Sequence, residues 1–118
     1  PGRSLVATPG VTLYTVGILK TLPGIRKYVA IDGGMSDNIR TALYHAEYEP
    51  VIANKAGQPR TEIVTLCGKH CESGDAVALD ASIQHPDLGD IVCCIWHRSY
   101  CHSMSSNYNG QPRLVLCL

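Results

Sequence analysis

Residues 61–75 read TEIVTLCGKHCESGD, and this stretch indicates both the type of fold and the place where chemistry is expected. Its first part, Thr61 to Cys67, is rich in β-branched and apolar side chains, which is typical of a strand. Its second part, Lys69 to Asp75, places a base, an imidazole, a thiol and a carboxylate side by side before Gly74 breaks the run. Charged side chains are costly to bury without partners. The pattern therefore predicts a strand that delivers a reactive cluster to a loop at a cleft.

The thiol of Cys71 is the candidate reactive group of this loop. Lys69 and His70 precede it and favour its thiolate form, whereas the carboxylate of Glu72 opposes that form. The alternative interpretation is a polar turn that holds one half-buried cysteine and has no chemical role. The residue types alone leave both interpretations open.

The overall composition excludes several classes of protein. The 118 residues include ten basic and ten acidic side chains, so the formal net charge is zero. A neutral chain lacks the usual electrostatic attraction for nucleic acid or an anionic membrane surface, and no apolar run is long enough to span a bilayer. We therefore expect one soluble, cytoplasmic domain that binds neither nucleic acid nor membrane. The chain opens on Pro1-Gly2-Arg3 rather than on Met, which we interpret as part of a longer polypeptide.

Six cysteines in a chain of this length allow a disulfide framework. Cys93 and Cys94 are adjacent in an apolar stretch and Cys117 lies in another, so we expect these three to be small buried hydrophobic side chains. We accordingly predict free thiols in a reducing cytoplasm. A zinc site is the alternative, although the spacing lacks the paired pattern of a zinc ribbon or finger. Its candidate ligands are Cys67, His70, Cys71, His97, Cys101 and His102.

Short β-type runs separated by turn residues make up most of the chain. The one predicted helix is short and covers Ser36 to Tyr44, where Ser36 or Asp37 provides a cap. On such a helix Arg40 and Tyr44 are four residues apart and share one face. The sequence thus predicts a mainly β fold, a barrel or sandwich with one short helix. Strands are expected at residues 4–7, 11–19, 28–31, 48–53, 61–67, 91–96 and 114–118.

Four motifs, in this order along the chain, resemble those of the diaminopimelate decarboxylase family. They are PGRS at residues 1–4, DGGMSDNIR at 32–40, GKHCESGD at 68–75 and SMSSNYN at 103–109. The first resembles the end of the family's Glu-Pro-Gly-Arg motif, with the Glu just outside this chain. Because the resemblance covers nearly the whole chain and the motifs are separate and ordered, it is specific.

The resemblance implies a fold and an activity. Members of the family are pyridoxal-phosphate enzymes in which a TIM-like α/β barrel precedes a C-terminal β domain. They convert meso-diaminopimelate to L-lysine and carbon dioxide, the last step of lysine biosynthesis, as homodimers whose active sites are shared between subunits. By this resemblance, residues 1–7 are the last strand of a barrel that is otherwise absent from this chain, and residues 8–118 form the C-terminal β domain.

The resemblance also implies roles for individual residues. Cys71 is the expected catalytic proton donor, acting from the partner subunit, and its thiol has an acidity suited to returning a proton to carbon. Arg40 and Tyr44 are expected to bind a substrate carboxylate, and Glu72 the distal ammonium group. The remaining implied positions are Gly2 and Arg3 at the cofactor phosphate, with Arg3 also near the substrate, and Tyr100 at the cofactor and substrate.

Two differences from the family bear on activity. Arg98-Ser99 stand where the family has Gly-Ala before the tyrosine that matches Tyr100, and none of the lysines, Lys20, Lys27, Lys55 and Lys69, lies in the context of the family's Schiff-base lysine. We therefore predict that this polypeptide alone is inactive.

The alternatives are a decarboxylase of another diamino acid, a non-catalytic zinc-binding β module that uses the Cys/His cluster, and an interaction domain that has kept the motifs without the chemistry. Arg98 is the feature that favours the last alternative.

Overall fold

The regular structure is dominated by strands. The structure is a computed structural model, and it describes residues 10–95 and 101–117. In chain order the elements are β1 (Val11–Leu22), β2 (Arg26–Ile31), α2 (Arg40–Tyr44), β3 (Pro50–Ile52), η1 (Ala53–Lys55), β4 (Glu62–Cys67), β5 (Ala76–Ile83), β6 (Ile91–Ile95), α3 (Cys101–Met104) and η2 (Tyr108–Gly110), where η marks a 3₁₀ helix.

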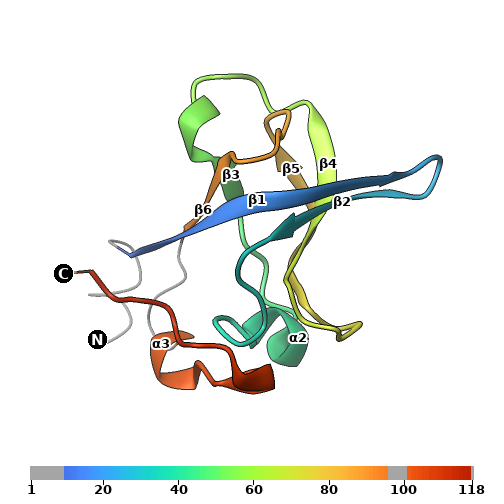
Figure 1. Ribbon diagram of the computed structural model, residues 1–118. Helices are drawn as coiled ribbons and strands as arrows, with labels where there is room; N and C mark the ends of the chain where they lie inside the picture. The colour runs from blue at the N-terminus through green and yellow to red at the C-terminus, as the bar shows by residue number, and fades with distance from the viewer. Residues whose placement is uncertain (1–9, 96–100, 118) are drawn as a thin grey trace.

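The six strands form one sheet in the order β3-β6-β1-β2-β4-β5 (Figure 1). β2 and β4 run parallel, and the other neighbouring pairs are antiparallel. The sheet curls until the edge strands β3 and β5 contact each other. At this seam the Gln84 side chain accepts a hydrogen bond of 3.0 Å from the backbone N–H of Ile52, which replaces a strand-to-strand bond. The result is a nearly closed barrel, so the predicted mainly β fold is confirmed.

The long strand β1 holds the two halves of the barrel together. Its residues 11–15 pair with β6, and residues 16–22 pair with β2. The register shifts between Val16 and Ile18, around Gly17, as in a β-bulge that bends a strand and increases its twist. β1 then turns into β2 through Pro23-Gly24, where Gly24 has a φ of 71° and Ile25 N–H donates to the Leu22 carbonyl. This is the geometry that favours Pro and then Gly at the two central positions of a type II turn.

The barrel interior is apolar and receives side chains from all six strands. Each Val, Ile or Leu that is fully buried contributes roughly 1.5–3 kcal/mol through removal of apolar surface from water. The alternation of buried and exposed residues along the strands therefore selects the side that faces inward. The buried hydrophobic residues of the strands are Tyr14, Val16, Val29, Ile31, Ile52, Val64, Leu66, Val77, Ala78, Ala81, Ile83, Val92 and Cys94.

The predicted last strand, at residues 114–118, is wrong for residues 114–117. These residues form no strand, and Leu114, Val115 and Leu116 are exposed. Their composition is that of a strand, but the two edges of the sheet are occupied by contact with each other, which leaves no edge for a seventh strand. Cys117 is also exposed, so the expectation that it is buried is wrong, whereas Cys94 is buried as expected and Cys93 half-buried.

The helices also differ from the prediction. The helix expected from Ser36 starts only at Arg40, because the N–H groups of Asp37 and Asn38 both donate to the Gly34 carbonyl and form a turn. A second short helix, α3, was not expected, since four residues are too few to show an amphipathic period. No helix in the described ranges, 10–95 and 101–117, has the length and apolar character needed to cross a membrane. The strand expected at residues 4–7 and the end of that at 91–96 lie outside the described residues.

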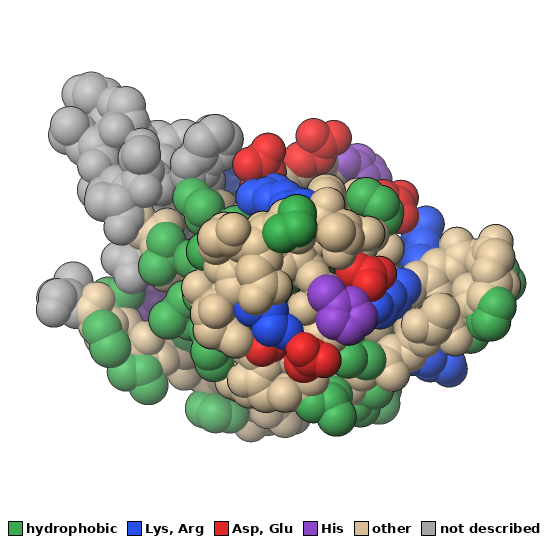
Figure 2. Space-filling view, turned by 90° about the horizontal axis from the view of Figure 1, so that it is seen from above, with side chains coloured by type: hydrophobic (Ala, Val, Ile, Leu, Met, Phe, Trp, Pro, Cys, Tyr) green, Lys and Arg blue, Asp and Glu red, His purple; other side chains and the backbone are tan. Residues whose placement is uncertain are grey.

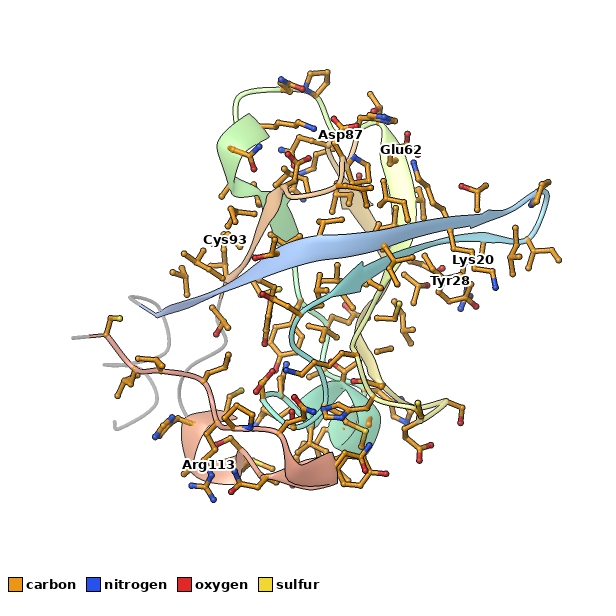
Figure 3. All side chains as sticks on the ribbon, in the orientation of Figure 1. Lys20, Tyr28, Glu62, Asp87, Cys93 and Arg113 are labelled. Atoms are coloured by element: carbon orange, nitrogen blue, oxygen red, sulfur yellow. The ribbon has the colours of Figure 1, made fainter. Side chains whose placement is uncertain are left out.

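The two ends of the barrel differ in the side chains and elements that they carry. At the upper end of Figure 1, the Lys55 ammonium pairs with Asp87 and Asp90, each at 2.6 Å, and His85 contacts Glu62 at 2.7 Å. Figure 2 looks down on this end and shows basic, acidic and histidine side chains interspersed, and Figure 3 labels Asp87 and Glu62 there. These charges are paired with one another. The lower end carries α2, α3 and the loop between β4 and β5 (Figure 1).

Candidate active site

Three of the motifs singled out in the sequence meet at the lower end of the barrel. They are residues 32–40, residues 68–75 and residues 103–109, which lie far apart in the chain (Figure 3). Hydrogen bonds join the first to each of the other two: the N–H of Lys69 donates to the Gly33 carbonyl at 3.0 Å, and the N–H of Ser106 to the Ser36 carbonyl at 2.8 Å. The strand order of the barrel, rather than local sequence, brings these segments together.

Residues 68–75 form a closed loop between β4 and β5, as predicted. The N–H of Gly68 donates to the carbonyl of Asp75 at 2.9 Å, which closes the base of the loop. Within the loop, Asp75 N–H donates to the Glu72 carbonyl at 3.0 Å, and Glu72 N–H to the His70 carbonyl at 2.8 Å. The loop is therefore held by its own backbone, and its tip projects from the barrel, with Cys71 exposed.

The carboxylate of Asp75 fixes this loop to the turn at Gly34. It is 4% exposed, and its two oxygens accept hydrogen bonds from the backbone N–H groups of Met35 (2.6 Å) and His70 (2.8 Å). Glycines make room for it: a Cβ on Gly68 would lie 2.2 Å from one carboxylate oxygen, and a Cβ on Gly34 would lie 2.6 Å from the other. Sequence reasoning assigned no role to Asp75. Gly34 and Gly68, which leave room for the carboxylate, were the feature of the sequence that could have indicated this role.

The side chain of His70 points into the domain, in contrast to its neighbour Cys71. His70 is largely buried, and its Nε2 shares a hydrogen bond of 2.8 Å with the hydroxyl of the buried Ser36. The edge of the Tyr108 ring packs against the imidazole, with centroids 5.3 Å apart. His70 therefore connects all three motif segments. The sequence interpretation treated this residue as a neighbour of the thiol and as a candidate zinc ligand.

Arg40 and Tyr44 lie on one face of α2, as predicted. The Arg40 guanidinium carbon lies 5.4 Å from the centre of the Tyr44 ring, which is a cation–π distance. The helix is fixed at its start by Asn38, whose side-chain oxygen accepts from Arg40 N–H at 3.1 Å, and on its buried side by Thr41, whose hydroxyl donates to the Val77 carbonyl at 2.8 Å. The guanidinium is thus held on a short helix that is anchored to β5.

The predicted site residues fall into separate groups. Cys71 and Glu72 are exposed on the loop tip, while Arg40 and Tyr44 lie on α2. Within the described part of the chain, no hydrogen bond, ion pair or ring contact joins one pair to the other. The positions predicted to face the cofactor, Gly2, Arg3 and Tyr100, lie outside the described residues, as do Arg98 and Ser99.

A polar cluster missed in the sequence lies beneath α2. The side-chain oxygen of Asn38 also accepts from the Tyr48 hydroxyl at 3.4 Å and from the Cys101 thiol at 3.5 Å. Burial raises the pKa of both the Tyr48 hydroxyl and the Cys101 thiol, so both groups stay protonated. Nearby, burial also raises the pKa of the Asp37 carboxyl, against the lowering effect of the Gly34 N–H, which donates to it at 3.0 Å.

The proposed zinc ligands do not converge in the described ranges. There, no three His, Cys, Asp or Glu side chains form a group that could hold a metal ion. The His70 ring nitrogen is engaged by Ser36, Cys101 contacts Asn38, and His97 lies outside the described residues. All six cysteines are free thiols in the structure.

Comparison with known protein families identifies the family to which this domain belongs. A model of the C-terminal sheet domain of pyridoxal-dependent decarboxylases matches residues 8–95. This chain belongs to that family. A relative from Bacillus subtilis (strain 168), a diaminopimelate decarboxylase, is 50% identical over 113 residues, a match that covers 96% of this chain and 26% of the relative. The diaminopimelate decarboxylase of Synechocystis is 48% identical over 118 residues, covering 98% and 25%.

Solved structures of this decarboxylase family share the fold. The diaminopimelate decarboxylase of M. jannaschii, in co-complex with L-lysine, superposes with a TM-score of 0.85 at 36% identity, covering 96% of this chain and 25% of that chain. The present chain thus spans about a quarter of the length of the relatives it matches.

The lysines of this decarboxylase domain lie on its surface or in ion pairs. The cofactor needs a lysine for a Schiff base. Lys27 pairs with Glu62 at 3.2 Å and Lys55 pairs with two aspartates at the opposite end of the barrel, while Lys20 and Lys69 are exposed. No lysine in the described ranges is buried.

Proposed function

We propose that this chain is the C-terminal β domain of a pyridoxal-phosphate-dependent diaminopimelate decarboxylase that converts meso-diaminopimelate to L-lysine and carbon dioxide. The observation that carries the proposal is the match along almost the entire chain to relatives of that name at about half identity. We propose further that residues 1–7 end a preceding barrel, that residues 8–118 form the β domain, and that the enzyme works in the cytoplasm.

The charged groups at the lower end suit a substrate with two amino-acid ends. A guanidinium binds a carboxylate with two parallel hydrogen bonds, and a phenol beside it supplies a third. Arg40 and Tyr44 provide this pair on α2, in contact with each other. The carboxylate of Glu72 matches an ammonium group at the other end of the substrate. The exposure of Glu72 on the loop tip leaves it available for such a partner.

Cys71 is the proposed source of the proton. Decarboxylation breaks the bond between the α-carbon and its carboxylate, and a new C–H bond must replace it. The thiol at Cys71 Sγ delivers that proton and is then reprotonated from solvent. Its exposed place on a loop with a fixed base allows it to enter a site formed elsewhere.

The separation of the two pairs supports a shared site. Cys71 and Glu72 lie on the loop tip and Arg40 and Tyr44 on α2, and no contact within the described chain joins the two pairs. A homodimer in which each loop tip enters the partner's site brings the two pairs together. We include this arrangement in the proposal.

Pyridoxal phosphate supplies the electron sink for loss of carbon dioxide when it is bound by the longer polypeptide. The lysines of this chain are paired with carboxylates or exposed, which supports a Schiff-base lysine outside it. It follows that the 118-residue polypeptide alone is inactive. Production of lysine by the isolated chain would contradict this part of the proposal.

The test is substrate preference in the full-length polypeptide with pyridoxal phosphate added. Release of carbon dioxide is measured from meso-diaminopimelate, L-lysine and L-ornithine at equal concentrations. We expect kcat/KM for meso-diaminopimelate to exceed the other two by ~10³-fold or more, since groups built to bind a distal carboxylate are left unpaired by substrates that lack it. A preference for lysine or ornithine would instead favour the decarboxylase of another diamino acid.

A further inference from the structure

We propose that His70 is a positioning residue of this site. Its imidazole, held by Ser36, fixes the loop that carries Cys71 and Glu72 to the turn that leads into α2. The loop tip that enters the partner's site and the helix that carries Arg40 in the domain's own site would then be mechanically coupled. The inference deepens the proposed function and rests on it for its catalytic consequence, but the coupling itself can be measured without activity.

The anchor of the loop is a buried hydrogen bond between two side chains. Ser36 is 2% exposed and His70 is 9% exposed, and their Oγ and Nε2 atoms lie 2.8 Å apart. A buried polar group that loses its partner keeps the full cost of leaving water. The pair therefore has a strong preference for the bonded arrangement, in which the His70 ring points inward.

The tip of the loop depends on His70 for its position. The Asp75 carboxylate accepts from the N–H of His70 within the loop and from the N–H of Met35 in the turn that follows β2. Beyond His70, the next backbone bond runs from Glu72 N–H to the His70 carbonyl, at 2.8 Å. Cys71 lies between these two residues. Rotation of His70 out of its pocket would therefore carry Cys71 and Glu72 with it.

Ser36 transmits the anchor to the helix that carries Arg40. Ser36 belongs to the turn in which the N–H groups of Asp37 and Asn38 donate to the Gly34 carbonyl. The Asn38 side chain then accepts from Arg40 N–H at 3.1 Å and fixes the first residue of α2. One path from Cys71 to Arg40 thus consists of one buried side-chain bond and a hydrogen-bonded turn, beside the backbone bonds that Gly33 and Met35 make to the loop.

The third motif supports the same pair from the other side. The Ser36 carbonyl accepts from Ser106 N–H at 2.8 Å, and the Tyr108 ring packs edge-on against the imidazole. Residues 103–109 therefore act on the pair without contributing a reactive group of their own. This accounts for a motif to which the proposed chemistry assigns no catalytic residue.

The experiment uses the full-length holoenzyme in four forms: wild type, Ser36→Ala, His70→Leu and the double variant. Hydrogen–deuterium exchange is followed in the backbone of residues 69–75 and 35–41, and kcat for meso-diaminopimelate is measured beside it. His70→Gln, which places an amide near the Nε2 position, tests rescue. Gln84→Met removes a buried side-chain hydrogen bond at the barrel seam instead and is the matched control.

We expect each single variant to raise exchange in both segments and to lower kcat by about five- to tenfold, the effect of one ordinary hydrogen bond. The double variant should raise exchange and lower kcat no further than either single variant does, and His70→Gln should recover part of the kcat lost in His70→Leu. Gln84→Met should lower stability but leave exchange in the two segments unchanged.

The coupling between the loop and the turn would be overturned if hydrogen exchange in residues 69–75 and 35–41 were unchanged in Ser36→Ala. It would also be overturned if the double variant showed the sum of the two single-variant effects on exchange and kcat. Raised exchange with wild-type kcat would overturn the positioning role. A wild-type holoenzyme without decarboxylase activity would refute the proposed function, while the exchange data would still decide whether the loop is coupled to the turn.

Discussion

The carboxylate of Asp75 accepts a 2.6 Å hydrogen bond from the backbone N–H of Met35, a residue 40 positions earlier in the chain. This bond ties the loop between β4 and β5 to the turn that follows β2. Asp75→Asn removes the charge and turns an amide toward backbone donors, so we expect the free energy of unfolding to fall by about 2 kcal/mol.

Urea denaturation of the purified protein checks this prediction. Asp80→Asn is the matched control, because Asp80 is exposed on β5, pairs with Arg26 at 3.4 Å, and has a positive φ that Asn tolerates. This control substitution should change the free energy of unfolding by less than about 0.5 kcal/mol. Equal losses of unfolding free energy in the two variants would show that the Asp75 carboxylate does not hold the loop to the turn.

Two glycines of the same loop should respond differently to a methyl group. A Cβ on Gly68 would lie 2.2 Å from the Asp75 carboxylate, whereas a Cβ on Gly74 meets no atom within 4 Å. We expect Gly68→Ala to destabilise the protein by about 1–3 kcal/mol through overpacking. Gly74→Ala should be neutral or slightly stabilising, since it reduces the entropy of the unfolded chain. Thermal unfolding that ranks the two variants in the opposite order would contradict the geometry of the loop.

The buried carboxyl of Asp37 should make stability depend on pH. Burial raises its pKa above the ordinary value of 3.8, despite the hydrogen bond from Gly34. A carboxyl with a raised folded pKa contributes stability that is present below the unfolded pKa and is lost as pH rises through the folded pKa. Asp37→Asn stays neutral and keeps an acceptor for Gly34.

The variant should therefore gain stability relative to wild type between about pH 4 and about pH 7. Urea denaturation of both proteins at the two pH values measures the difference directly. A difference that does not change with pH would mean that Asp37 titrates in the folded protein as it does in the unfolded chain.

The sequence was sufficient where local pattern decides the structure. Runs of β-branched and apolar residues located β1, β2 and β4, and the charged run at residues 69–75 correctly predicted a loop. The spacing of Arg40 and Tyr44 placed both on one helix face. In each case the physical cause acts within a few residues: a side-chain period, the cost of burying charge, or the rise of a helix.

The sequence was insufficient where the outcome depends on contacts across the barrel. Asp75 looks like one more exposed charge of its loop until the turn at Met35 supplies its donors. The run at residues 114–117 has strand composition, but the sheet offers it no edge. Cys101 was a candidate zinc ligand, yet its partner is Asn38, more than sixty positions away.

Arg40 should control substrate affinity rather than stability. Arg40→Lys keeps the charge but loses the planar pair of donors and the stacking on Tyr44, so we expect KM for meso-diaminopimelate to rise about tenfold or more in the full-length enzyme. Arg26→Lys, at the start of β2, is the control and should leave KM unchanged. Steady-state kinetics on both variants provide the test, and an unchanged KM in Arg40→Lys would remove this residue from substrate binding.

The role of Cys71 is tested most directly by the rate of L-lysine formation from meso-diaminopimelate, in full-length enzyme with pyridoxal phosphate. Wild type is compared with Cys71→Ala and with Cys117→Ala, which removes another exposed thiol. We predict that kcat falls by about 10²–10⁴-fold in Cys71→Ala, the usual contribution of a positioned proton donor, and is unchanged in Cys117→Ala. Wild-type turnover by Cys71→Ala would contradict the proposal that this loop delivers the proton.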